Sequence, residues 1–460
     1  MTERFVFLTG HLARTRLRRT LEGMGETGFT WEVIDIGVQV AALMTEPIIL
    51  RRLPRTLAAT RVILPGRAGV DPARLTEAFG LPFTRGPDEI VDLPRFLGRG
   101  AAPPDLSRHD VRIFAEIVDA PTLSMDALRA RAHALREHGA DVIDIGCKPG
   151  LPFPHLEQTV AMLRDDGFSV SVDSGDLAEL RRGAVAGADF LLSLTEHSLD
   201  VAAGTQAIPI VVPAPDGGID SLIRAADAAR ARAIPVLLDP ILEPIHFGFT
   251  ASLQRYAALR ARLPDAGILM GTGNLTELTD ADSSGVTAIL MGICSELAIR
   301  NVLVVQVSPH TSRTVEEHDF ARRLMYAARA DGDLPRGYGD ALLQIHDRAP
   351  LVQSAAEIAA LAAGVRDANY RIAVAEDGIH LYNARMHEVG RDAMSLFPAL
   401  DIAADAPHAF YLGTELMKAE IAFALGKRYV QDEALEWGCA APRAARDKTR
   451  LAEAGPTKRP

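Results

Sequence analysis

Short apolar runs alternate with amphipathic segments along most of the chain. Over residues 1–100 the runs Arg4 to Leu8, Trp31 to Ile36 and Arg61 to Leu64 predict strands, and arginine-rich helical patterns lie between them. This pattern predicts a small N-terminal α/β domain. The stretch Gly98 to Ser107 is rich in glycine and proline, so residues 101–110 are expected to form a linker.

From Val111 the alternation becomes regular and extends to residue 332. The predicted strands are Val111 to Val118, Val142 to Ile145, Val170 to Asp173, Phe190 to Leu194, Ile208 to Val212, Val236 to Asp239, Gly267 to Met270 and Val302 to Val305. Alanine-rich helical segments separate them, and we expect a crossover helix after each strand. Eight such units over residues 111–332 predict a central (β/α)₈ TIM barrel.

The pattern changes again over residues 333–440, which are expected to form a C-terminal α+β domain. Tyr370 to Ala375 and Ile379 to Asn383 flank a short turn and predict a β-hairpin. A long helix is expected from about Phe410 to Leu425, ended by Gly426 as its C-terminal cap. Residues 441–460 are charged and contain two prolines, so they are expected to be a flexible tail.

Composition narrows the functional classes. Hydrophobic residues make up 48% and charged residues 24% of 460 residues, as in an ordinary globular protein of several domains. The net charge of -11, without long basic runs, argues against a nucleic-acid partner. Neither a signal peptide nor an apolar stretch of membrane-spanning length is recognised, and the three cysteines are widely spaced. These features predict a cytoplasmic protein with no membrane association.

The barrel prediction also assigns directions to side chains. Strands of a closed barrel are buried on both faces, so polar residues within them must point inward. Asp144, Asp173 and Asp239 are then expected to converge at the C-terminal rim of the barrel, with Asn274 just beyond the seventh strand. Such carboxylates suit a ligand with N–H donors, such as a pterin, or could hold Mg²⁺. A strand-end aspartate also commonly caps a turn or the next helix.

Four motifs carry a resemblance to a known family. They are GADVIDIGCKPG (Gly139 to Gly150), SVDS (Ser171 to Ser174), GADFLLSL (Gly187 to Leu194) and LLDP (Leu237 to Pro240). In order and spacing they resemble dihydropteroate synthases and related pterin-binding barrels. The resemblance implies that Asp173 and Asp239 bind the pterin ring. It also implies a reaction, helped by Mg²⁺, in which an arylamine attacks a dihydropterin methyl diphosphate after ionisation.

The chain departs from that family at several motif positions. The family's asparagines on strands one and four fall near Val118 and near Leu192 or Ser193. The loop after strand two is shortened to Gly146, Cys147, Lys148 and Pro149, which leaves Lys148 as its cation. The loop after strand seven becomes Thr272, Gly273 and Asn274, and the arginine-x-histidine of strand eight becomes Gln306, Val307 and Ser308. These differences remove expected contacts to diphosphate and arylamine and argue against ordinary folate synthesis.

The whole chain looks more similar to the dihydropteroate synthase-related proteins of methanogens and methylotrophs, which are associated with tetrahydromethanopterin. Segments Gly271 to Leu278, Val304 to Thr314 and Ala409 to Glu433 carry this likeness. The resemblance implies a transferase of alkyl or aryl groups in one-carbon metabolism, with a pterin and an arylamine as its small-molecule partners. The implied acceptor is a ribofuranosylaminobenzene phosphate.

The expected site follows from these inferences. Lys148 and Asp144 are the candidate catalytic residues, and the candidate pterin-binding residues are Asp173, Asp239, Asn274 and Ser193. No residue is assigned as a metal ligand, although Mg²⁺ remains an option as a cofactor, and a homodimer is one option for the assembly. Two alternatives stay open: a non-catalytic pterin carrier or scaffold, and a corrinoid-dependent pterin methyltransferase. The second lacks the DxHxxG cobalamin signature in this chain and would need a separate corrinoid protein.

Overall fold

The computed structural model describes residues 3–88, 90–98, 104–402 and 405–442. The chain divides into two compact units. Residues 104–344 and 438–440 form one unit, and the described residues among 3–98, 345–437 and 441–442 form the other. The predicted boundaries at residues 100, 110, 332 and 440 stay predictions. Residues 101–103 of the predicted linker and 443–460 of the predicted tail lie outside the described residues.

The barrel unit confirms the predicted fold class. Its eight strands are β5 (Arg112–Ile117), β6 (Val142–Gly146), β7 (Ser169–Asp173), β8 (Phe190–Leu194), β9 (Ile208–Val211), β10 (Leu237–Leu238), β11 (Gly267–Gly271) and β12 (Asn301–Val304). They close in the order β10-β11-β12-β5-β6-β7-β8-β9, and neighbouring strands are parallel. The predicted strands therefore match the observed ones closely, except that the sixth is only two residues long.

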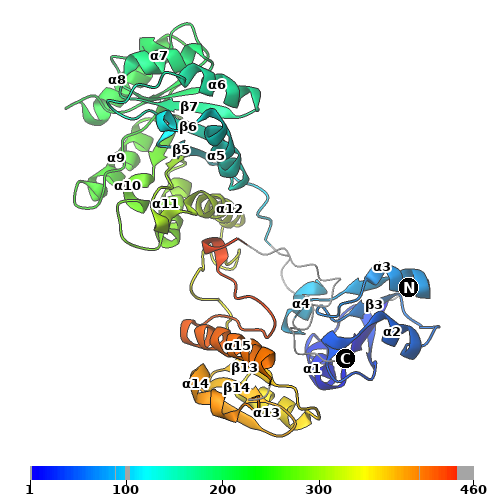
Figure 1. Ribbon diagram of the computed structural model, residues 1–460. Helices are drawn as coiled ribbons and strands as arrows, with labels where there is room; N and C mark the ends of the chain where they lie inside the picture. Colours follow the sequence, from blue (N-terminus) through cyan, green and yellow to red (C-terminus); the bar gives the residue numbers. More distant parts are fainter. Residues whose placement is uncertain (1–2, 89, 99–103, 403–404, 443–460) are drawn as a thin grey trace. The chain divides into compact units, whose positions relative to one another are not determined.

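Helices lie outside the strands (Figure 1). They are α5 (Met125–Glu137), α6 (Leu156–Asp165), α7 (Leu177–Val185), α8 (Gly218–Ala231), α9 (Phe249–Arg262), α10 (Gly273–Thr276), α11 (Ser283–Glu296) and α12 (Thr314–Asp331). The prediction of a crossover helix after each strand is wrong for β8. The connection from β8 to β9 contains only a short 3₁₀ helix, Leu199–Ala202, and Gly204 follows it with φ 72°. Further 3₁₀ turns of this unit are Ala120–Thr122, Pro309–Thr311 and Gly438–Ala440.

Alternating side chains of the strands form two layers. Outward residues such as Val170 and Val172 of β7 pack in the large core between strands and helices. The inward residues of the lower barrel are apolar: Phe114, Val142, Phe190, Leu192, Ile210, Leu237 and Leu269 fill it. The Phe114 and Phe190 rings meet edge to face, 4.9 Å between centroids. One inward position further along β5 and β6, polar residues replace this apolar layer at the C-terminal ends of the strands.

The other unit begins with a parallel four-stranded sheet in the order β2-β1-β3-β4. Its elements are β1 (Glu3–Thr9), α1 (His11–Gly23), β2 (Phe29–Asp35), α2 (Glu46–Arg52), β3 (Arg61–Leu64), α3 (Pro72–Phe79), β4 (Phe83–Arg85) and α4 (Leu93–Phe96), with 3₁₀ turns at Ala41–Leu43 and Ile90–Asp92. The three predicted strands are confirmed. The pattern missed β4 because its three residues are too short to show an alternation.

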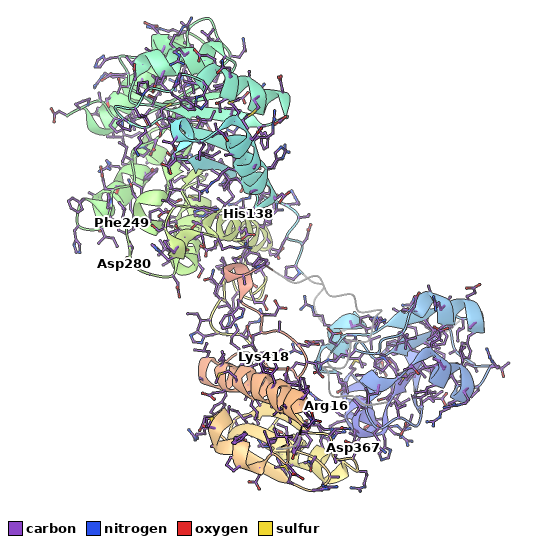
Figure 2. All side chains as sticks on the ribbon, viewed as in Figure 1. Arg16, His138, Phe249, Asp280, Asp367 and Lys418 are labelled. Atoms are coloured by element: carbon purple, nitrogen blue, oxygen red, sulfur yellow. The ribbon has the colours of Figure 1, made fainter. Side chains whose placement is uncertain are left out.

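The same unit contains the later elements α13 (Ala355–Gly364), β13 (Arg371–Ala375), β14 (Gly378–Tyr382), β15 (His387–Gly390), α14 (Ala393–Leu396), the 3₁₀ turn Phe397–Ala399 and α15 (Ala406–Leu425). The predicted hairpin is confirmed, since β13 and β14 pair antiparallel, and β15 adds a third strand. Gly426 ends α15 with φ 61°, as predicted. Arg16 of α1, labelled in Figure 2, donates to the carbonyl oxygen of Val352 at 2.8 Å.

No helix within the described ranges combines the length and the apolar character that crossing a lipid bilayer requires.

Candidate functional site

Three carboxylates on neighbouring strands form what we call the acidic layer: Glu116 of β5, Asp144 of β6 and Asp173 of β7. Glu116 is opposite Asp144 in the strand register, and Asp173 is opposite Gly146. One carboxylate oxygen from each residue lies within 4.8 Å of the other two. Asp144 is fully buried, whereas Glu116 and Asp173 are partly exposed. The sequence analysis identified Asp144 and Asp173 but missed Glu116.

Few hydrogen-bond donors of the described residues stabilise the ionised form of the acidic layer. Both carboxylate oxygens of Asp144 are buried without a hydrogen-bond partner among the described residues, and so is the hydroxyl oxygen of Ser171 opposite it. Burial, reinforced by the charges of Asp173 and Glu116, raises the pKa of Asp144 well above its usual value, and the neighbouring Ser171 hydroxyl acts in the opposite direction. Burial and the charge of Asp173 raise the pKa of Glu116 to about 7. The layer therefore favours a ligand that brings positive charge or hydrogen-bond donors.

Asp173 belongs to the acidic layer and lies at the barrel mouth, by which we mean the rim formed by the C-terminal ends of the eight strands. Burial raises its pKa to about 6, and a hydrogen bond with the Ser193 hydroxyl acts in the opposite direction. Ser193 itself is exposed on β8. The helix after β7 is capped by Asp176, whose carboxylate accepts from the Ala178 backbone N–H at 2.8 Å. Asp173 is thus not occupied as the cap of that helix.

Asp239 lies directly after β10 and is held in place by two hydrogen bonds. Its Oδ1 accepts from the hydroxyl of the buried Tyr256 and from the Ile241 backbone N–H, each at 2.8 Å. Both bonds fall on Oδ1, so among the described residues Oδ2 is left to meet a ligand. Burial raises the pKa of Asp239 to about 6, and the charge of Asp173 adds to this rise. Asp239 therefore caps the turn after β10 with one carboxylate oxygen, Oδ1, and this role does not use the other oxygen.

The two remaining candidates are less clearly placed for binding. Asn274, in α10, is exposed, and its side-chain Nδ2 donates to the carbonyl oxygen of Leu242 at 2.8 Å. That bond ties the amide to the loop after β10 and leaves its Oδ1 and its second N–H for a ligand. Lys148 is exposed in the loop after β6, and no hydrogen bond or ion pair joins its ammonium group to the described part of the chain.

Gly146, the last residue of β6, sits against the acidic layer. A Cβ atom at this position would lie 2.6 Å from Glu116 Oε1, 3.1 Å from Val118 Cα and 3.2 Å from the Ile117 carbonyl oxygen. We expect Gly146→Ala to lower the free energy of unfolding by about 1–3 kcal/mol, because the added methyl group overpacks the site and displaces the Glu116 carboxylate. Urea unfolding followed by far-UV circular dichroism measures this loss.

The double variant Gly146→Ala with Glu116→Ala provides the matching control. Removing the carboxylate makes room for the methyl group. The double variant should therefore lose less unfolding free energy than the sum of the losses of the two single variants. Strictly additive losses would show that Gly146 and Glu116 do not interact.

Comparisons with known proteins show where this chain has counterparts. A model of a family of unknown function (DUF6513) matches residues 3–88, which contain the four-stranded sheet. An uncharacterized protein of Methanocaldococcus jannaschii is 26% identical over 370 residues, covering 70% of this chain and 69% of that protein.

Solved dihydropteroate synthases are similar to about half of the chain. The Vibrio fischeri enzyme is 17% identical with a TM-score of 0.37 and covers 49% of this chain and 94% of its own. The Burkholderia cenocepacia enzyme, solved as a complex with 7,8-dihydropteroate, is 20% identical with a TM-score of 0.38 and covers 49% and 93%. At these low identities and TM-scores, the comparison does not assign a ligand to the barrel mouth. Any such assignment depends on the side chains of Asp173, Asp239 and their neighbours.

Proposed function

We propose that the barrel mouth binds a reduced pterin between Asp173 and Asp239. The observation that carries this proposal is the placement of two partly exposed carboxylates at the C-terminal ends of β7 and β10, on the same rim of the closed parallel barrel. The amino-pyrimidinone edge of a pterin offers several N–H donors in one plane. Charge-assisted hydrogen bonds from these donors would offset the burial of both carboxylates.

We further propose that the bound pterin is a substrate in a transfer reaction. The resemblance described above supports a dihydropterin methyl diphosphate as donor and a ribofuranosylaminobenzene phosphate as acceptor, in tetrahydromethanopterin biosynthesis. The C–O bond to diphosphate breaks and its electron pair leaves with the diphosphate. The arylamine nitrogen then forms the new C–N bond and releases a proton to solvent. Mg²⁺ would supply charge stabilisation for the departing diphosphate.

Each side chain has a limited part in this reaction. Asp173 and Asp239 orient the ring, and Tyr256 fixes Asp239 through its hydroxyl group. The Ser193 hydroxyl lowers the pKa of Asp173 and so favours its ionised form. Lys148, exposed after β6, is the cation available to the diphosphate in that loop. Asp144 is buried in the acidic layer and makes no direct contact with the ring in this proposal.

A coupled assay tests the transfer reaction. The full chain is incubated with Mg²⁺, 6-hydroxymethyl-7,8-dihydropterin diphosphate and either p-aminobenzoate or ribofuranosylaminobenzene phosphate, and diphosphate and product are measured. We expect diphosphate release together with a pterin-arylamine product, and faster turnover with the ribosyl acceptor. Release of neither diphosphate nor product would contradict the transferase proposal, and Asp173→Asn serves as the binding-deficient control.

A non-catalytic pterin carrier is the second candidate. It is favoured by the loop after β6, where Lys148 is the one cationic side chain between Cys147 and Gly150. A carrier would bind the dihydropterin in calorimetry with an affinity unchanged by Mg²⁺ and diphosphate, and it would give no product in the coupled assay.

A further inference from the structure

We propose that the acidic layer binds one divalent metal cation of the oxygen-seeking class, such as Mg²⁺ or Mn²⁺, through Glu116, Asp144 and Asp173. This proposal concerns residues of the chain itself and holds whether or not a pterin binds above them. Two of the three ligands, Asp144 and Glu116, have no other contact assigned to them in the pterin proposal.

The spacing of the carboxylates suits a single ion. The three oxygens lie within 4.8 Å of one another. Two ligands on opposite sides of one ion can be about 4.2 Å apart for Mg²⁺ and about 5 Å apart for Ca²⁺, since the bond lengths are about 2.1 and 2.3–2.6 Å. Only one pair among three ligands can lie on opposite sides of an ion, and the other pairs are closer together. The flexible carboxylates must therefore turn towards one another for all three oxygens to enter one coordination sphere.

The buried Asp144 side chain is an independent sign of a missing partner. It is fully buried, and neither of its oxygens has a hydrogen-bond partner among the described residues. Buried polar groups in folded proteins almost always have partners, and an unpartnered one commonly marks an ion or water. The nearby Ser171 hydroxyl is buried and unpartnered as well, and it lies opposite Asp144 in the register of β6 and β7.

Protein cations do not neutralise this group. Within the described part of the chain, no ion pair joins Glu116, Asp144 or Asp173 to a lysine, arginine or histidine. Three carboxylates this close together repel one another strongly when all are ionised. They must therefore take up protons or a cation, and the two outcomes can be separated by experiment.

The donor set also limits the class of cation. All three ligands are carboxylate oxygens, the donors that Mg²⁺, Mn²⁺ and Ca²⁺ prefer over softer metals. Glu116 and Asp173 are partly exposed, so the remaining coordination positions can be filled by water or by an oxygen of a ligand at the mouth. Such an arrangement is typical of a cation that keeps open positions for a substrate.

Direct titration with Mn²⁺ tests the site without any pterin. The full chain is treated with EDTA, dialysed at pH 8, and titrated while free Mn²⁺ is followed by electron paramagnetic resonance. We expect one Mn²⁺ per wild-type chain, competed by Mg²⁺. Asp144→Asn and Glu116→Gln should each weaken binding by about tenfold or more, because each removes a charged ligand at nearly constant volume.

Asp239→Asn is the matched control, since it removes a carboxylate of the same mouth outside the acidic layer. It should leave the Mn²⁺ affinity within about threefold of wild type, as expected for a charge that does not coordinate the ion. Thermal unfolding gives a second readout: Mn²⁺ should raise the Tm of wild type and of Asp239→Asn but not of Asp144→Asn.

The opposite results would overturn the proposal. If wild type shows no saturable Mn²⁺ binding at pH 8, protons rather than a metal neutralise the acidic layer. If Asp144→Asn and Glu116→Gln bind Mn²⁺ as wild type does, the ion occupies another site. Neither result bears on pterin binding, which Asp239→Asn tests separately.

Discussion

Asp239→Asn is expected to weaken binding of 6-hydroxymethyl-7,8-dihydropterin by about 100-fold. The asparagine keeps an Oδ1 that can still accept from the Tyr256 hydroxyl and the Ile241 backbone N–H, so the local structure should persist. Its amide group, however, places N–H donors where the ring also presents donors. Losing charge-assisted hydrogen bonds in a buried site costs about 3 kcal/mol, which corresponds to about 100-fold in affinity.

Isothermal titration calorimetry with the full chain measures this loss, and two variants calibrate it. Tyr256→Phe removes one of the two bonds that position Asp239, so it should weaken binding by a smaller factor of about 3 to 10. Asp227→Asn changes an exposed carboxylate on α8 that pairs with Arg230 and should bind as wild type does. Wild-type affinity in Asp239→Asn would show that Asp239 does not contact the pterin.

Arg322→Met is expected to lower the stability of the barrel by about 3 kcal/mol or more. Arg322 of α12 is 2% exposed and connects the last helix of the barrel to its beginning. It donates to the carbonyl oxygens of Val111 at 2.7 Å and Gly139 at 3.0 Å, and it forms ion pairs with Asp141 and Asp319. Methionine retains the bulk of the side chain but removes the donor to the Val111 and Gly139 carbonyl oxygens and the counter-charge of Asp141 and Asp319.

The position of the tryptophans allows the loss to be assigned to one unit. Trp31 and Trp437 are the two tryptophans of the chain, and both belong to the unit outside the barrel. In urea unfolding, Arg322→Met should shift the transition seen by far-UV circular dichroism to lower urea. The transition seen by tryptophan fluorescence should shift less, because it reports the other unit.

Arg329→Met is the control for Arg322→Met. Arg329 lies on the same helix, but its side chain is 36% exposed and pairs with Asp110 at 2.6 Å. A surface ion pair of this kind contributes at most about 1 kcal/mol. Equal losses in the two variants would contradict the view that the buried hydrogen bonds of Arg322 close the barrel.

The sequence predicted the barrel because each strand leaves a strong local signal. The residues of β7, for example, alternate between outward valines and inward polar side chains, and the observed burial follows this order. The same rule applied to β5 would have placed Glu116 inward, two positions after Phe114. Glu116 lies outside the family motifs, because the family's asparagine on this strand falls near Val118.

Other features of the site depend on contacts that no local pattern records. The meeting of Glu116, Asp144 and Asp173 depends on the register between three strands. The bond from Tyr256 to Asp239 joins residues 17 positions apart, and Tyr256 belongs to none of the family motifs. The short connection between β8 and β9 was predicted as a helix because its composition does not distinguish a 3₁₀ turn from an α-helix.

Contacts between distant parts of the chain show the same limit. The division of residues 1–100 and 333–440 into separate domains stays a prediction. Contacts such as the hydrogen bond from Arg16 to the Val352 carbonyl group join residues 336 positions apart. Periodicity within a window of about 11–18 residues cannot detect pairings at that distance.

A crystal structure of the full chain soaked with 6-hydroxymethyl-7,8-dihydropterin tests the central claim most directly. We predict difference density for a flat bicyclic ring at the C-terminal ends of β7 and β10, with its N–H groups within hydrogen-bond distance of the Asp173 and Asp239 carboxylates. Density for the pterin at another place, with both carboxylates left in contact with water alone, would contradict it.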